Sequence, residues 1–127
     1  MQTELLFKEE CYTVVGLCMK VHTKLGRGFK EIVYKDALEV ELKKVGITYE
    51  REKTFSILYD EVLLPHKFNA DFLVFNNIVL EIKAAILTHS DGLYQTLNYL
   101  KALNIKLGIL INFGTPRLEY HRIICTY

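Results

Sequence analysis

Two carboxylates and one amine lie close together in two apolar segments that read as the arms of one β-hairpin. Asp71 is followed ten residues later by the run Glu81-Ile82-Lys83. Two carboxylates at close range repel each other, so they need either a proton or a cation between them. Oxygen ligands favour a hard ion, Mg²⁺ or Mn²⁺, over zinc. With Lys83 beside the ion to steady developing negative charge, such a site could cleave phosphodiester bonds.

The register of this hairpin decides whether the carboxylates can share an ion. The two arms, residues 69–75 and 78–83, flank an Asn-Asn pair. A two-residue loop would place Asp71 and Glu81 on opposite faces. A three-residue loop, 76–78, makes them diagonal neighbours with β-carbons roughly 7–8 Å apart. The pairs expected from it are Phe75 with Val79, Leu73 with Glu81, and Asp71 with Lys83. We therefore predict an odd-length loop or a β-bulge.

Alternation assigns each side chain of the hairpin to one of two faces. One face is expected to carry Ala70, Phe72, Val74, Ile78, Leu80 and Ile82. The other is expected to carry Asp71, Leu73, Phe75, Val79, Glu81 and Lys83. The alternative to a metal site is a surface salt bridge of Lys83 with Asp71 or Glu81, because this spacing often arises by chance.

The elements that must position these residues follow from hydrophobic periodicity and turn residues. Helices are expected within 4–25, 30–45 and 89–104, and strands at 47–59, 62–66, 106–113 and 118–125 besides the two arms. Pro65 limits the short 62–66 strand to an edge or a bend. A hairpin followed by a crossover helix and a further strand predicts a mixed α/β sheet with helices on both faces.

Length and composition bound the class of protein. The chain has 127 residues, 50% of them hydrophobic, which predicts one domain over 1–127 with its own core. The formal net charge of +1 neither requires nor excludes nucleic acid. Three cysteines without a C-x-x-C pair, no basic leader and no long apolar run predict a cytoplasmic protein without a membrane span. The basic residues cluster locally as Lys20, Lys24, Arg27, Lys30 and Lys35.

Several blocks of the chain resemble a known family in the same order. The segment Gly28 to Tyr34 fits the signature of the GxxExxY family, and the segments 70–74, 79–84, 95–100 and 108–114 resemble its later blocks. That family is placed in the PD-(D/E)XK nuclease superfamily, and Q-x-x-x-Y is typical of its RecB-like members. The resemblance implies a restriction-endonuclease-like α-β-β-β-α-β core, here with an N-terminal helix and a C-terminal strand added. Ala70 stands where the superfamily often has proline.

The resemblance also implies roles for individual residues. Asp71 and Glu81 would be the principal metal ligands, the main-chain carbonyl of Ile82 a further ligand, and Lys83 the catalytic amine. Glu31 would supply a helix carboxylate to the Mg²⁺ or Mn²⁺ site. Gln95 and Tyr99 would contact substrate or orient the site, as would Tyr34. From the residues alone, Glu31 also suits a helix start, and both tyrosines suit packing positions.

The expected function is metal-dependent hydrolysis of nucleic acid, with DNA favoured over RNA. The alternative is a non-catalytic nucleic-acid-binding or protein-assembly module that keeps the nuclease fold, because fold does not fix function. Hydrolysis of a small phosphate ester is a third, weaker hypothesis. A homodimer or an unidentified protein partner would complete a groove in so small a chain.

Overall fold

The computed structural model describes residues 7–86 and 90–126. The elements in chain order are α1 (Lys8–Leu25), α2 (Glu31–Val45), β1 (Tyr49–Tyr59), β2 (Val62–Val74), β3 (Ile78–Lys83), α3 (Ser90–Leu103), β4 (Leu107–Asn112) and β5 (Glu119–Ile124). No helix in these described ranges is long and apolar enough to cross a membrane.

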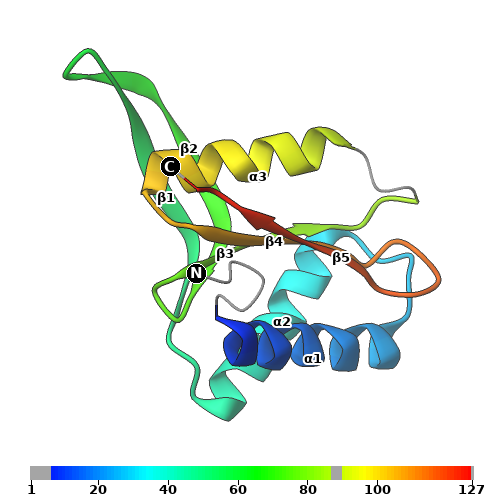
Figure 1. The fold of residues 1–127 in the computed structure, drawn as a ribbon. Coiled ribbons are helices and arrows are strands. Elements are labelled where there is room, and N and C mark those ends of the chain that lie inside the picture. Colours follow the sequence, from blue (N-terminus) through cyan, green and yellow to red (C-terminus); the bar gives the residue numbers. More distant parts are fainter. Residues whose placement is uncertain (1–6, 87–89, 127) are drawn as a thin grey trace.

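One five-stranded sheet forms the middle layer, in the order β1-β2-β3-β4-β5. β3 and β4 are parallel, and the other neighbouring strands are antiparallel. The helices α1 and α2 cover one face of the sheet, and α3, the crossover between β3 and β4, covers the other (Figure 1). The predicted α-β-β-β-α-β core is confirmed from α2 to β4, with α1 and β5 added at its ends.

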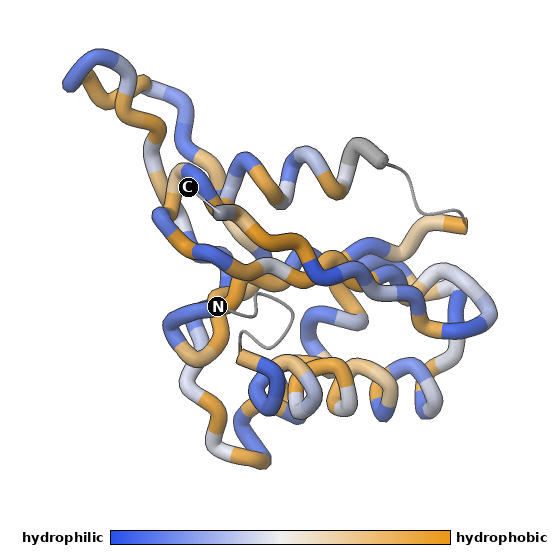
Figure 2. The backbone as a smooth tube through the Cα atoms, viewed as in Figure 1, coloured by the Kyte–Doolittle hydropathy of each residue, from blue (hydrophilic) through white to orange (hydrophobic). Residues whose placement is uncertain are grey.

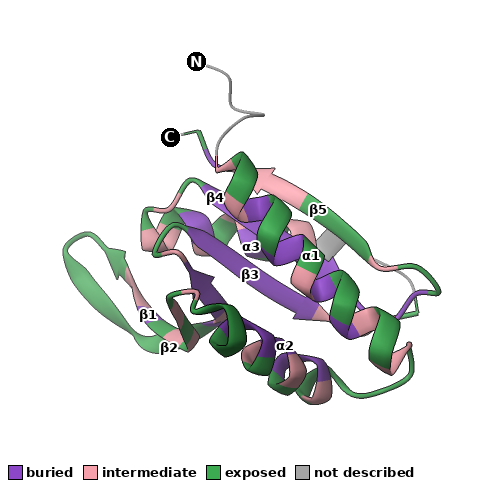
Figure 3. Ribbon diagram, turned by 90° about the horizontal axis from the view of Figure 1, so that it is seen from below, coloured by how far each residue is buried: buried purple, intermediate pink, exposed green. Residues whose placement is uncertain are grey.

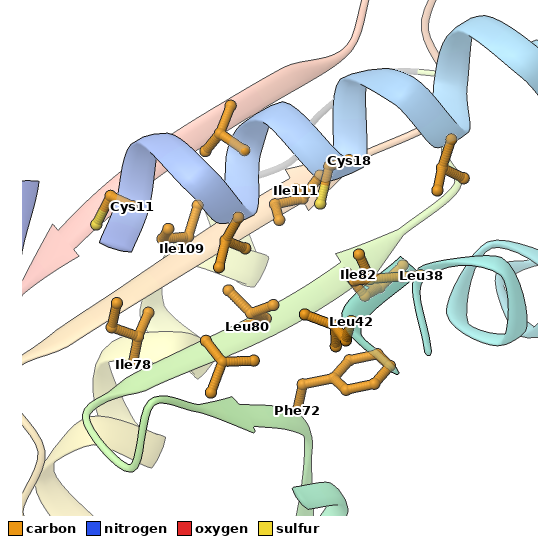
Figure 4. Close-up of a cluster of buried hydrophobic side chains, with 14 of the residues drawn as sticks. Cys11, Cys18, Leu38, Leu42, Phe72, Ile78, Leu80, Ile82, Ile109 and Ile111 are labelled. Atoms are coloured by element: carbon orange, nitrogen blue, oxygen red, sulfur yellow. The ribbon is translucent and has the colours of Figure 1, made fainter. Parts of the chain in front are cut away.

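The larger core lies between the sheet and the helices α1 and α2 (Figure 4). Leu38 and Leu42 of α2 pack there against Phe72, Leu80 and other apolar side chains of the sheet. A smaller cluster on the other face joins α3 to residues including Leu73 and Val79. In β3, only the terminal Lys83 is not fully buried, as expected for a central strand covered on both faces (Figure 3).

β2 differs from the sequence prediction because it is one strand of 13 residues rather than two separate strands. Its register against β1 shifts between Ser56 and Leu58, which pair with Lys67 and Leu63. Pro65 lies within that irregularity, where the ladder does not need its missing N–H group. The separate 62–66 strand was therefore wrong, whereas the expectation that Pro65 would lie at an edge or a bend is confirmed, because β3 pairs only with residues 72–74 of β2.

The odd-length loop between β2 and β3 is confirmed, but its position and the predicted pairs were wrong. Val74 pairs with Ile78 and Leu73 with Val79, so the three loop residues are 75–77. Phe75 and Asn76 have φ values of 55° and 59°. Two successive left-handed residues let the chain reverse earlier than the Asn-Asn pair suggested. Asp71 therefore lies opposite Glu81 in register, and Lys83 lies beyond both.

Two residues lie on the opposite face from the predicted one. Ala70 packs in the α3-side cluster, and Phe75 packs against the core on the α1 and α2 side. Phe75 belongs to the turn, where strand alternation no longer applies. Ala70 precedes a break in strand alternation at Asp71, whose side chain contacts Lys35 of α2. The candidate site lies at this break.

We expect Leu80→Ala to lower the free energy of unfolding by about 2–5 kcal/mol, because Leu80 is fully buried in the central strand. Leu63→Ala is the matched control, since Leu63 is 66% exposed, and it should change stability by less than about 0.5 kcal/mol. Urea denaturation measures both. Equal losses in the two variants would contradict the placement of the core.

Candidate active site

Asp71 and Glu81 meet where the ladder between β2 and β3 opens. The last ladder pair on this side is Phe72 with Leu80. Beyond it, the Asp71 N–H donates to Glu81 Oε2 at 2.9 Å, and the Ile82 N–H donates to Asp71 Oδ2 at 2.7 Å. Each carboxylate thus accepts a hydrogen bond from the main chain of the opposite strand. These reciprocal bonds hold the two acidic side chains together.

Glu81 is held in an environment that opposes its charge. The residue is only 3% exposed. Burial, followed by the nearby negative charge of Asp71, raises the pKa of Glu81 to about 8. The Asp71 N–H and the positive charges of Lys83 and Lys35 oppose this rise without cancelling it. A carboxyl group with such a pKa binds a proton at neutral pH unless a cation replaces that proton.

Lys35 of α2 forms an ion pair with Asp71. Its Nζ donates to Asp71 Oδ1 at 3.0 Å and also to Glu52 of β1. The Lys35 side chain is only 11% exposed. Burial lowers the pKa of its ammonium group, but the hydrogen bonds and charges of Glu52 and Asp71 outweigh that effect and raise it. Lys35 therefore remains charged beside Asp71.

A backbone irregularity brings Glu52 to this ion pair. The ladder between β1 and β2 pairs Arg51 with Phe72 and Lys53 with Ala70, but it skips Glu52 and Asp71 between them. Glu52 has a φ of 55°, a left-handed conformation that costs a non-glycine residue roughly 1–2 kcal/mol. The neighbours Arg51 and Glu52 consequently both contact α2, which regular strand alternation would not allow.

Lys83 stands at the end of β3 beside Asn112 of β4. It forms no ion pair with any residue in the described part of the chain, yet its charge lowers the pKa of Glu81. The predicted alternative, a salt bridge of Lys83 with either carboxylate, is thus not found among the described residues. Asp71 is paired instead with Lys35.

The helix residues expected near the site differ in their placement. Glu31, the first residue of α2, is exposed, and it lies one turn before Lys35 on the same face of the helix. Tyr34 is fully buried; its hydroxyl donates to the Gly26 carbonyl at 2.6 Å and accepts from the Phe29 N–H at 3.2 Å. Tyr34 therefore fixes the turn between α1 and α2 and cannot touch a substrate directly.

Gln95 and Tyr99 lie on α3, on the other side of the sheet from α2. Both line a groove between α3 and β1. Burial, and then the charges of Glu81 and Asp71, raise the pKa of the Tyr99 hydroxyl. Tyr99 is thus within electrostatic range of the carboxylates, whereas Gln95 is exposed one turn away.

The donors at the ladder opening fit a hard divalent cation with a small number of protein ligands. Mg²⁺ is often held by one or two carboxylates and keeps several waters, which suits Asp71 and Glu81. No group of three His, Cys, Asp or Glu side chains that could hold a metal occurs in the described ranges. Glu31 accordingly does not join the two carboxylates in such a group.

Sequence reasoning missed the parts played by Lys35 and Glu52. Lys35 was grouped with four other basic residues in a general cluster. Its spacing of four residues from Glu31 would have placed it on the same helix face. No sequence pattern marked Glu52, because its position depends on a left-handed backbone inside an otherwise regular strand.

A model of the PD-(D/E)XK nuclease superfamily matches residues 8–123. The chain belongs to this superfamily. The match extends from the start of α1 into β5, so it includes both carboxylates and Lys83. Membership in the narrower GxxExxY family stays a prediction.

Among solved structures, the chain is similar to the crystal structure of SSO0001, with a TM-score of 0.61 and 26% sequence identity. The aligned part covers 76% of this chain and 51% of that one. The chain therefore spans about half the length of SSO0001. No curated protein matches the chain.

We expect the protein without bound metal to lose stability as the pH rises from about 4.5 to about 8. Glu81 keeps its proton in the folded state up to about pH 8, whereas its ordinary pKa is 4.5. In this window the folded state binds more protons than the unfolded state, so unfolding becomes easier with increasing pH. Glu81→Gln should remove this dependence and stabilise the protein at pH 9, by on the order of a few kcal/mol.

Urea denaturation in EDTA at pH 5, 7 and 9 measures this effect. The exposed Glu61 provides the matched control, and Glu61→Gln should leave the pH dependence of wild type in place. The same slope in wild type and Glu81→Gln would contradict the raised pKa.

Proposed function

We propose that the chain is a metal-dependent nuclease that hydrolyses phosphodiester bonds in nucleic acid. The main support is the pair Asp71 and Glu81, brought together at an opened ladder with one carboxyl group buried and its pKa raised. Perturbed acidic groups of this kind cluster at functional sites. Membership in the nuclease superfamily makes phosphodiester hydrolysis the reaction to test first.

The proposed site uses residues from the sheet and both helix layers. Asp71 and Glu81 would hold Mg²⁺ or Mn²⁺, with the Ile82 carbonyl as a further ligand and Glu31 as an outer carboxylate. A divalent cation there supplies charge stabilisation at the phosphate and makes an attacking water more acidic. Lys83 Nζ would donate hydrogen bonds to the phosphoryl oxygens as negative charge develops.

Binding of the nucleic-acid backbone would depend on fewer basic residues than the five of the cluster identified in the sequence. Lys20 is paired with Glu41 at 2.9 Å, and Lys35 is paired with Asp71 and Glu52. Three members of the basic cluster remain for phosphate contacts, namely Lys24, Arg27 and Lys30. Contacts of this type are insensitive to sequence and weaken with salt. They suit DNA and RNA alike, and we favour DNA as the substrate.

A second candidate is a non-catalytic binding or assembly module of cytoplasmic location, acting with a nucleic acid, a second copy or another protein. One observation favours it: Lys35 forms an ion pair with Asp71. The negative charge of Asp71 is therefore already balanced without a metal. A binding module does not need affinity for Mn²⁺ at Asp71 and Glu81. Metal affinity therefore separates the two functions.

We expect Mn²⁺ to bind wild type with one dominant site and to lose most of its affinity in Asp71→Asn and Glu81→Gln. Lys35→Met should bind Mn²⁺ at least several-fold more tightly, because a fixed positive charge no longer repels the ion. Lys20→Met is the matched control, since Lys20 is paired with Glu41 away from the site. Isothermal titration calorimetry measures all five proteins. No Mn²⁺ binding by wild type would favour the binding module.

We expect Lys83→Ala to lower the rate of cleavage by at least about 100-fold while preserving the fold and Mn²⁺ affinity, because the amine acts on the reacting phosphate. Lys106→Ala, at an exposed lysine before β4, is the matched control. The assay uses supercoiled plasmid, linear duplex, single-stranded DNA and RNA, in Mn²⁺ or Mg²⁺ against EDTA. Metal-dependent cutting that survives in Lys83→Ala would exclude the proposed role of Lys83.

A further inference from the structure

A groove of about 790 Å³ lies on the α3 side of the sheet. One wall is α3, and the other is the base of the projecting β1–β2 arm, residues 55–68, which extends beyond the sheet (Figure 1). The arm carries apolar stretches on both of its strands (Figure 2). The lining of the groove includes Phe55, Phe68, Tyr94, Gln95, Asn98 and Tyr99.

The lining combines aromatic rings with amides. Phe55 stacks on Phe68 with ring centroids 5.9 Å apart, and it meets the edge of Tyr99 at 5.2 Å. Phe68 is 40% exposed and Tyr94 is 68% exposed, so both present ring surface to solvent. Gln95 and Asn98 add side-chain amides that can both donate and accept hydrogen bonds.

The charge of the lining suits an anionic chain. Among the described residues that form the groove, Lys101 is basic and none is acidic. The described lining therefore offers a polyanion one lysine and no carboxylate.

The groove approaches the candidate active site along β2 and α3, because Tyr99 lines it and also packs in the cluster that contains Ala70, the residue before Asp71. Phe68 is three residues before Asp71 on β2, a distance of roughly 10 Å along a strand. The same occupant could thus contact the rings and present a phosphate to the carboxylates.

We propose that this groove binds the unpaired nucleotides of a single strand, with bases stacked on Tyr94 and Phe68. Every base has a π-face, so aromatic rings bind unpaired nucleotides with little sequence preference. The bases of a duplex are stacked on each other and cannot reach these rings. This inference rests on the proposed nuclease function and specifies its substrate as single-stranded, or as the frayed end of a duplex.

The first test uses a fluorescent reporter in the groove. The chain has no tryptophan, so Tyr94→Trp creates one emitter there, and Tyr12→Trp creates one on α1, where Tyr12 is 82% exposed. A short oligothymidylate in EDTA should quench the emission of Tyr94→Trp and leave that of Tyr12→Trp unchanged. Equal responses of the two variants would overturn the proposal.

Affinity measured by fluorescence anisotropy in EDTA provides the second test. Tyr94→Ala should bind oligothymidylate roughly tenfold more weakly, whereas Tyr94→Phe and Tyr12→Ala should bind like wild type. Oligouridylate tests whether the ribose matters, and a blunt duplex of equal length should bind more weakly than either single strand. Preference for the duplex, or equal losses in Tyr94→Phe and Tyr94→Ala, would overturn stacking.

Sedimentation and cleavage assays of wild type and Tyr94→Ala separate failure of this inference from failure of the proposed nuclease function. If wild type sediments as a dimer and Tyr94→Ala as a monomer, the groove is an interface between two copies and the proposal fails. Binding in EDTA does not require cleavage, so single-strand binding without metal-dependent cutting would defeat only the proposed function. Cutting that Tyr94→Ala leaves unchanged on single strands would defeat only this inference.

Discussion

The structure depends on how two carboxylates are accommodated in the middle of a covered sheet. Asp71 and Glu81 lie opposite each other on neighbouring strands, and Glu81 is almost completely buried. Like charges in such surroundings repel strongly because little water screens them. The ladder between β2 and β3 opens at this point, and the main-chain N–H groups of Asp71 and Ile82 donate hydrogen bonds to the two carboxylates.

The surrounding elements stabilise the charge of Asp71 more than that of Glu81. Lys35 approaches from α2 and pairs with Asp71, and the left-handed backbone at Glu52 lets a second acid share the same ammonium group. Among the described residues no lysine or arginine forms an ion pair with Glu81, and burial together with the charge of Asp71 keeps its pKa raised. Asp71 is thus neutralised by Lys35, and Glu81 remains available for a proton or a cation.

Much of the fold follows from local sequence patterns. Hydrophobic spacing was enough to locate all three helices, and the need to cover both faces of the hairpin implied a helix layer on each side. The site was harder to predict, because strand alternation assigned Asp71 and Glu81 to one face but gave the wrong partners. The left-handed residues Phe75 and Asn76 moved the turn, and Glu52 broke the alternation of β1. Neither effect follows from residue type, since all three residues more often adopt other conformations.

Two strand pairings of different sequence separation give the Glu81 carboxyl group its raised pKa. A loop of three residues brings β2 and β3 together, so the two charges meet through a local contact. The pairing of β3 with β4 joins Ile78 to Leu107 across the crossover helix, and this long-range contact removes water from Glu81. Long-range pairing carries the larger loop-closure entropy. The electrostatic cost of burying Glu81 is therefore tied to the strand pairing that joins the most distant segments of the sheet.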